Sequence, residues 1–151
     1  MTRIVSPFLF IWSGLLLGVS FVATPAKFLA PSLQLPQALD VGRWTFHVLT
    51  LIEWGLVLIA ALLVWACRLQ VAAGRRWVMI ALVAIAAVLA VETFFLRPIL
   101  DARVLDIMAG RSVPPSALHN LYIGLEALKL VLVLAAAIAS ARWTSATGAS
   151  Q

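Results

Sequence analysis

The chain contains four apolar segments that are each long enough to cross a lipid bilayer. They cover residues 4–24, 44–67, 77–97 and 116–141. About 20 apolar residues in a helix span the hydrocarbon core, which is roughly 30 Å thick. Because lipid offers no hydrogen-bond partners to a free backbone, each segment must be helical. The sequence therefore predicts an all-α integral membrane protein, a bundle of four transmembrane helices within residues 1–143, followed by a disordered tail at 144–151.

The composition excludes a soluble domain and argues against a nucleic-acid-binding protein. Hydrophobic residues make up 64% of the chain and charged residues 11%, whereas soluble chains are about 45–50% apolar and about 25% charged. The net charge of +5 is therefore interpreted as loop arginines that set the orientation and contact anionic lipid head groups. With Cys67 as the one cysteine, neither an internal disulfide nor a multi-cysteine metal site can form.

Helix signals extend two of the spans beyond the apolar core. The second helix is predicted to begin near Pro36, and the third to continue past Pro98 and stop at Gly110. Ser116 is a candidate N-cap for the fourth helix. The two extensions would project from the same side of the membrane as a small polar cap.

The orientation is predicted from the basic residues of the short loop between helices two and three. This loop carries Arg68, Arg75 and Arg76 at the membrane edge, and such loops face the cytoplasm. The expected location is the inner (plasma) membrane of a bacterium, with both termini in the cytoplasm.

Ionisable and polar side chains cluster in the outer half of three spans, and the inner half is apolar. A charged residue in a bilayer costs about 2.5–3.5 kcal/mol on insertion scales, so these groups are expected to face one another inside the bundle. On the fourth span they form one helical stripe. Arg97, near the end of the third span, is expected to reach toward the interface. The candidate site residues are His47, Glu53, Glu92, His119, Tyr122, Glu126 and Lys129.

A weak internal repeat relates the first two spans to the last two. Phe21-Val-Ala-Thr-Pro25 resembles Phe94-Phe-Leu-Arg-Pro98, and each is followed by a His-x-Leu sequence with a glutamate six or seven residues after the histidine. A parallel repeat of two helical hairpins implies a pseudo-twofold axis along the membrane normal. His47 and His119 would then face each other across it.

Several functions are compatible with this polar layer. A non-enzymatic pocket could bind or pass a small polar species or organise a partner. Alternatively, His47 and His119 could bind haem or a metal ion in a redox protein, or the groups could form ion pairs that only hold the bundle together. Gly14 and Gly18 form a small-xxx-small pattern that suits internal packing, a homodimer or contact with another membrane protein. No catalytic motif is present, and the bilayer is the one partner the sequence requires.

The chain resembles a family of small four-helix membrane proteins that includes the cisplatin-resistance-associated transmembrane protein and bacterial relatives. The resemblance covers most of the chain. It is carried by Phe21, Phe28 and Gly42, by Arg97-Pro98, and by His119 on the fourth span. It implies a four-helix membrane protein without an established reaction, and it supplies no catalytic residues. His47, Glu53 and Lys129 have no place in the family pattern.

Overall fold

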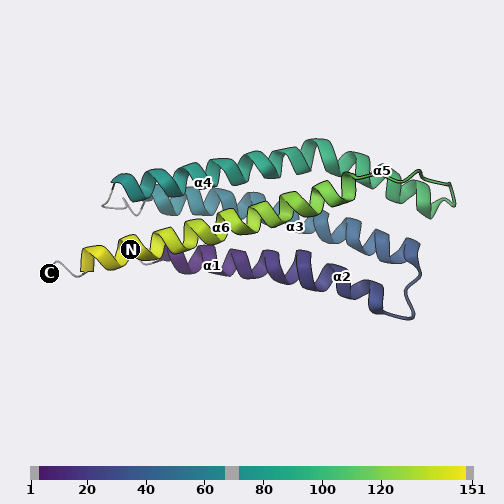
Figure 1. The fold of residues 1–151 in the computed structure, drawn as a ribbon, viewed down its shortest axis with the longest axis horizontal. Helices are drawn as coiled ribbons and strands as arrows, with labels where there is room; N and C mark the ends of the chain where they lie inside the picture. Colours follow the sequence, from purple (N-terminus) through teal and green to yellow (C-terminus); the bar gives the residue numbers. More distant parts are fainter. Residues whose placement is uncertain (1–3, 67–71, 149–151) are drawn as a thin grey trace.

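The computed structural model describes residues 4–66 and 72–148, and these form an elongated bundle of four helical spans (Figure 1). The first span is α1 (Val5–Leu16), the π-helical segment η2 (Leu17–Ala23), α2 (Thr24–Ala26) and the 3₁₀ turn η3 (Lys27–Leu29). The second span is α3 (Leu35–Ala66). The third is α4 (Ala72–Val91), the π-helical segment η4 (Glu92–Leu96) and α5 (Arg97–Met108). The fourth is α6 (Leu118–Gly148).

The predicted class is confirmed within the described residues, where four helices are long and apolar enough to cross a membrane. These helices indicate a multi-pass membrane protein. Both chain termini lie at one end of the bundle (Figure 1). We call this the proximal end, and the opposite end, with the loops at residues 30–34 and 109–117, the distal end.

The two helix extensions expected from the sequence are present in the structure. The second span begins at Leu35, and the third continues through Pro98 to Met108, before Gly110 adopts a φ of 71°. The hydroxyl of Ser116 accepts a hydrogen bond of 3.1 Å from the backbone N–H of Leu118, as an N-cap does. The fourth helix continues to Gly148, into the segment expected to be a disordered tail, of which residues 149–151 lie outside the described part. Arg68 and Cys67 also lie outside it.

Each π-helical segment directly precedes a proline in the first turn of the next α-helix. Proline has no N–H and its ring crowds the carbonyl four residues earlier, so a straight α-helix cannot pass through it unchanged. Both spans respond alike, because the N–H of Thr24 bonds to Val19 O and the N–H of Arg97 bonds to Glu92 O. These wider i to i−5 bonds are the mark of a π-bulge, and they occur at matching positions of the proposed repeat.

The proximal half of the bundle is a dry apolar core. Its serines are satisfied locally or by a neighbouring backbone, with Ser13 donating to Leu9 O at 2.9 Å and Ser6 to Ala137 O at 3.0 Å. Such a core holds the spans together without specifying any chemistry. Its buried members are Val5, Leu9, Trp12, Leu16, Ala60, Val64, Val78, Leu82, Ile85, Val133, Ala136 and Ala137.

The glycine pair of the first span packs against nothing inside the molecule. A Cβ added at Gly14 or Gly18 would meet no atom within 4 Å. Both glycines are exposed, and among the described residues no other span packs closely against them.

Candidate functional site

A buried ionic cluster occupies the distal half of the bundle, where all four spans contribute to it. Its centre is the ammonium of Lys129 on α6, which lies 2.8 Å from Glu53 Oε2 of α3, 2.7 Å from Glu92 Oε2 of η4 and 2.9 Å from Glu126 Oε1. The four side chains are 0–1% exposed. We call Glu53, Glu92, Glu126 and Lys129 the carboxylate cluster. The convergence expected from the sequence is thus present for these four residues.

The fourth span contacts the cluster twice because Glu126 and Lys129 are three residues apart. On an α-helix this spacing places both side chains on one face, one turn apart. Glu92 has no such neighbour on its own span. Its partner is Lys129 of the fourth span, whose ammonium lies 2.7 Å from Glu92 Oε2.

The hydrogen bonds within the cluster are unevenly shared. An ammonium has three donors and no acceptor, yet four carboxylate oxygens lie 2.7–3.0 Å from Lys129 Nζ. Both oxygens of Glu53 and one of Glu126 accept hydrogen bonds from it. Glu92 Oε2 lies 2.7 Å from the ammonium as an ion pair without hydrogen-bond geometry, and Glu92 Oε1, also buried, accepts no hydrogen bond. Glu92 is therefore the member of the cluster whose polar atoms are least satisfied.

Ser20 of η2 completes the cluster from the first span. Its hydroxyl donates to Glu126 Oε2 at 2.9 Å. Ser20 is half-buried, whereas the residues it joins are inaccessible. No sequence pattern indicates this role, because serines in apolar helices commonly bond to their own backbone, as Ser13 does here.

A second polar group lies next to the cluster, toward the distal end. His47 Nε2 is 2.7 Å from Asp101 Oδ2, and His47 Nδ1 is 3.3 Å from the guanidinium of Arg97. Arginine can only donate, so Nδ1 accepts and the ring proton lies on Nε2, where it is donated to Asp101. These contacts connect Arg97 through His47 to Asp101, whose side chain is 20% exposed.

Arg97 differs from its expected behaviour. It was expected to extend toward the membrane interface, but it is 9% exposed and bonded to His47. That expectation is wrong because His47 of the second span supplies a polar partner inside the bundle, so the guanidinium does not need to reach bulk water.

The remaining candidates separate into one buried and one exposed residue. Tyr122 is buried, and its ring meets Phe46 edge-on with 5.1 Å between centroids. His119 is exposed in the first turn of α6 and is not part of the cluster. His47 and His119 thus have different surroundings, and both ring nitrogens of His47 already have partners. The described residues contain no group of three or more His, Cys, Asp or Glu side chains arranged to hold a metal ion.

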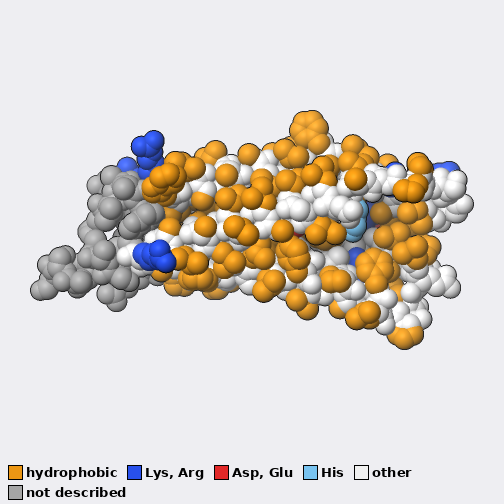
Figure 2. Space-filling model, viewed as in Figure 1, with side chains coloured by type: hydrophobic (Ala, Val, Ile, Leu, Met, Phe, Trp, Pro, Cys, Tyr) orange, Lys and Arg blue, Asp and Glu red, His pale blue; other side chains and the backbone are white. Residues whose placement is uncertain are grey.

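The polar groups reach the surface at the distal end. Figure 2 shows a face that is hydrophobic along most of its length, with histidine and Lys or Arg atoms visible in a hollow toward the distal end, between α6 and the first span. The polar interior of the distal half therefore reaches this side face of the bundle.

Fold and site together define a multi-pass four-helix membrane protein with an enclosed group of carboxylates in one half. Comparisons with protein families, with curated proteins and with solved structures found no match for the chain.

Proposed function

We propose that this is a non-enzymatic membrane protein that binds a small cation, in the simplest case a proton, at the carboxylate cluster. The observation that carries the proposal is the imbalance of charge, with three buried carboxylates around one ammonium. If all were ionised, the cluster would hold an excess of two negative charges. Buried charge without compensation is strongly unfavourable, so a further positive charge stabilises the cluster.

Glu92 is the proposed position of that charge. Its Oε2 contacts only the shared ammonium of Lys129, at 2.7 Å, and its Oε1 accepts no hydrogen bond; a buried acceptor left without a donor costs about 1–3 kcal/mol. A proton on Glu92 would remove one negative charge and give this carboxyl a donor of its own. A metal cation such as Na⁺ would provide the charge in a different way, by accepting oxygen ligands.

The surroundings of the cluster support binding more than passage through the membrane. On the distal side, Arg97, His47 and Asp101 continue the polar interior. On the proximal side, the described residues form an apolar core in which the serine hydroxyls are satisfied by backbone carbonyls. An ion that enters from the distal side would meet no comparable polar groups beyond the cluster.

The proposed orientation follows from the arginines of the α3–α4 connection. Arg75 and Arg76 are exposed near the start of the third span, at the same end as the chain termini, and basic loops face the cytoplasm. In the bacterial inner membrane, the cluster would then exchange its cation with the outer side.

The test is an infrared difference spectrum of the purified protein in lipid nanodiscs, recorded between low and high pH. The expected result is a protonated-carboxyl band that disappears on raising the pH and is missing in Glu92→Gln. Asp106→Asn is the matched control, because Asp106 is an exposed carboxylate paired with Arg111, and it should leave the band in place.

A second measurement separates a proton from a metal cation. Calorimetric titration with NaCl and with KCl at fixed pH should give heat that Glu92→Gln removes if a metal cation binds. Absence of both the carboxyl band and the cation heat from the wild-type protein would leave the cluster as a structural element alone, and the proposal would be wrong.

A further inference from the structure

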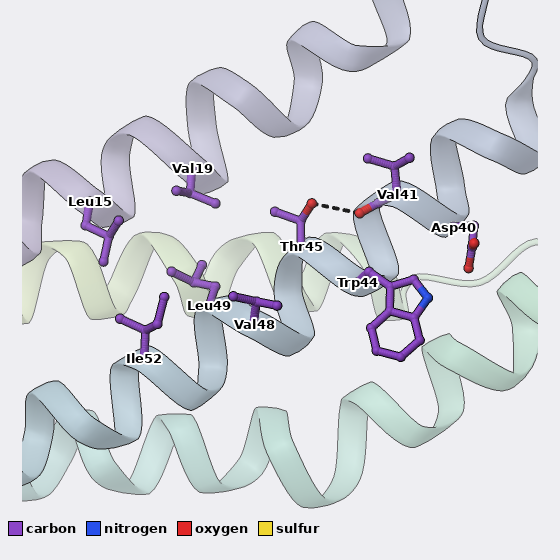
Figure 3. Close-up of a pocket in the computed structure, with 9 residues that line it drawn as sticks. All are labelled: Leu15, Val19, Asp40, Val41, Trp44, Thr45, Val48, Leu49 and Ile52. Carbon is purple, nitrogen blue, oxygen red and sulfur yellow. Dashed lines mark hydrogen bonds between the residues drawn. The ribbon is translucent and has the colours of Figure 1, made fainter.

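A cavity of about 530 Å³ lies between the first span and α3, outside the carboxylate cluster. Figure 3 shows its lining side chains, which come from α1 and η2 on one wall and from α3 on the other. Its apolar lining residues include Leu15, Val19, Val41, Val48, Leu49 and Ile52. Val41, Val48 and Ile52 are 43–54% exposed. The cavity is therefore a groove on the outside of the bundle, where a membrane protein meets lipid.

The walls of the groove offer almost nothing to a polar ligand. The hydroxyl of Thr45 already donates to Val41 O at 2.7 Å, as Figure 3 shows. Asp40, at the distal end, accepts two hydrogen bonds from Arg43, at 3.0 and 2.9 Å. Water would find few hydrogen-bond partners in such a groove. If the groove were empty, the side chains of its walls would lose dispersion contacts. A hydrocarbon chain suits it best.

A positive charge that pairs with no carboxylate of the described residues lies next to the α3 wall of the groove, near its distal end. Lys27, at the end of the first span, extends to α3, where a Cβ on Gly42 would lie 2.0 Å from its Nζ. The Lys27 ammonium therefore lies directly against Gly42. Gly42 is adjacent in sequence to Val41, which lines the groove. Among the described residues Lys27 makes no ion pair, and its ammonium lies 5.0 Å from the centroid of the Phe28 ring. The Asp40–Arg43 pair is neutral as a unit, so one positive charge remains.

Trp44 marks the depth of this end of the groove. It lines the groove, is 58% exposed and stacks with the guanidinium of Arg43 at 5.3 Å. Tryptophans of membrane proteins concentrate at the level of the lipid head groups. The groove therefore runs from head-group level into the hydrocarbon, with its positive charge at the head-group level.

We propose that this groove binds one acyl chain of an anionic phospholipid of the bilayer, with the lipid phosphate at the Lys27 ammonium. The apolar walls accept the chain, and the unpaired charge selects the head group. This site is independent of the proposed cation binding, because it shares no side chain with the carboxylate cluster.

The experiment is native mass spectrometry of the protein released from mixed nanodiscs of phosphatidylglycerol and phosphatidylcholine with identical acyl chains. The expected result is preferential retention of one phosphatidylglycerol. Lys27→Gln should reduce that preference about fivefold, the effect of roughly one basic charge at an anionic surface. Arg111→Gln is the matched control, because Arg111 is another exposed distal cation, and it should keep the preference.

Two further variants separate the head group from the chain. Gly42→Ala keeps the charge of Lys27 but displaces its ammonium, so the preference should fall while the net charge stays the same. Val48→Trp fills the groove and should remove retention of both lipids. Equal retention of the two lipids by the wild type, an unchanged preference in both Lys27→Gln and Gly42→Ala, or a second copy of the chain retained in place of lipid would each overturn the proposal.

Discussion

Removal of the Lys129 ammonium is the most direct test of how the bundle holds its three buried carboxylates. In Lys129→Met the side chain keeps a similar length and its apolar stem, but Glu53, Glu92 and Glu126 lose their common cation. Because all four side chains are 0–1% exposed, water cannot take its place without opening the bundle.

The magnitude follows from opposing contributions. At a separation near 2.8 Å and an effective dielectric constant of about 20, each contact contributes about 6 kcal/mol of attraction. Desolvation of each ion costs several kcal/mol, and the carboxylates repel one another. Breaking a buried ion pair by removing one partner typically costs about 3–5 kcal/mol. We expect Lys129→Met to lower the free energy of unfolding by about that amount.

The assay is reversible unfolding in mixed micelles with increasing dodecyl sulfate, followed by circular dichroism. The variant that also carries Glu53→Gln, Glu92→Gln and Glu126→Gln should recover most of the loss, since no unpaired charge remains. Arg111→Met, which breaks the exposed pair with Asp106, should cost at most about 1 kcal/mol. If Lys129→Met alone were as stable as Arg111→Met, the cluster would not be the desolvated ionic centre described above.

Two further predictions concern residues at the edge of the site. Ser20→Ala removes the donor to Glu126 Oε2 and should lower the free energy of unfolding by about 1–3 kcal/mol in the same assay. Ser13→Ala, which removes a bond to the helix's own backbone, should cost less. Equal losses in the two variants would contradict the role given to Ser20. The double variant His47→Ala with His119→Ala should have the same absorbance spectrum and metal content as the wild-type protein. A haem band or bound metal that is present in the wild type and lost in this variant would support the redox interpretation instead.

Much of this fold follows from the sequence because membrane insertion leaves few options. A long apolar run must be a helix, and a carboxylate within it must turn toward a partner. This reasoning correctly placed Glu53, Glu92, Glu126 and Lys129 together, at one depth and inside the bundle. Helical spacing was enough to place Glu126 and Lys129 on one face of α6. The cost of burying charge was the reason to expect Glu53 and Glu92 to face them.

The same reasoning gave wrong positions for side chains that had more than one possible environment. His119 lies on the expected stripe of α6, but in its first turn the residue is exposed, so the stripe did not determine its burial. Arg97 could have reached the interface or a neighbour, and the neighbour that it contacts, His47, lies on another span. Rules based on one helix do not contain that information.

The positions of Ser20 and Glu92 relate the carboxylate cluster to the proposed internal repeat. Both lie in π-helical segments that precede prolines, Pro25 and Pro98. A π-bulge inserts one residue into the helical register and rotates the side chains that follow relative to those before it. The prolines therefore have an indirect role, since they favour the bulges in which the first and third spans present their polar residues to the cluster. A duplication of one proline-bulged hairpin would account for a site to which all four spans contribute, with a carboxylate at related positions of the second and fourth spans, Glu53 and Glu126.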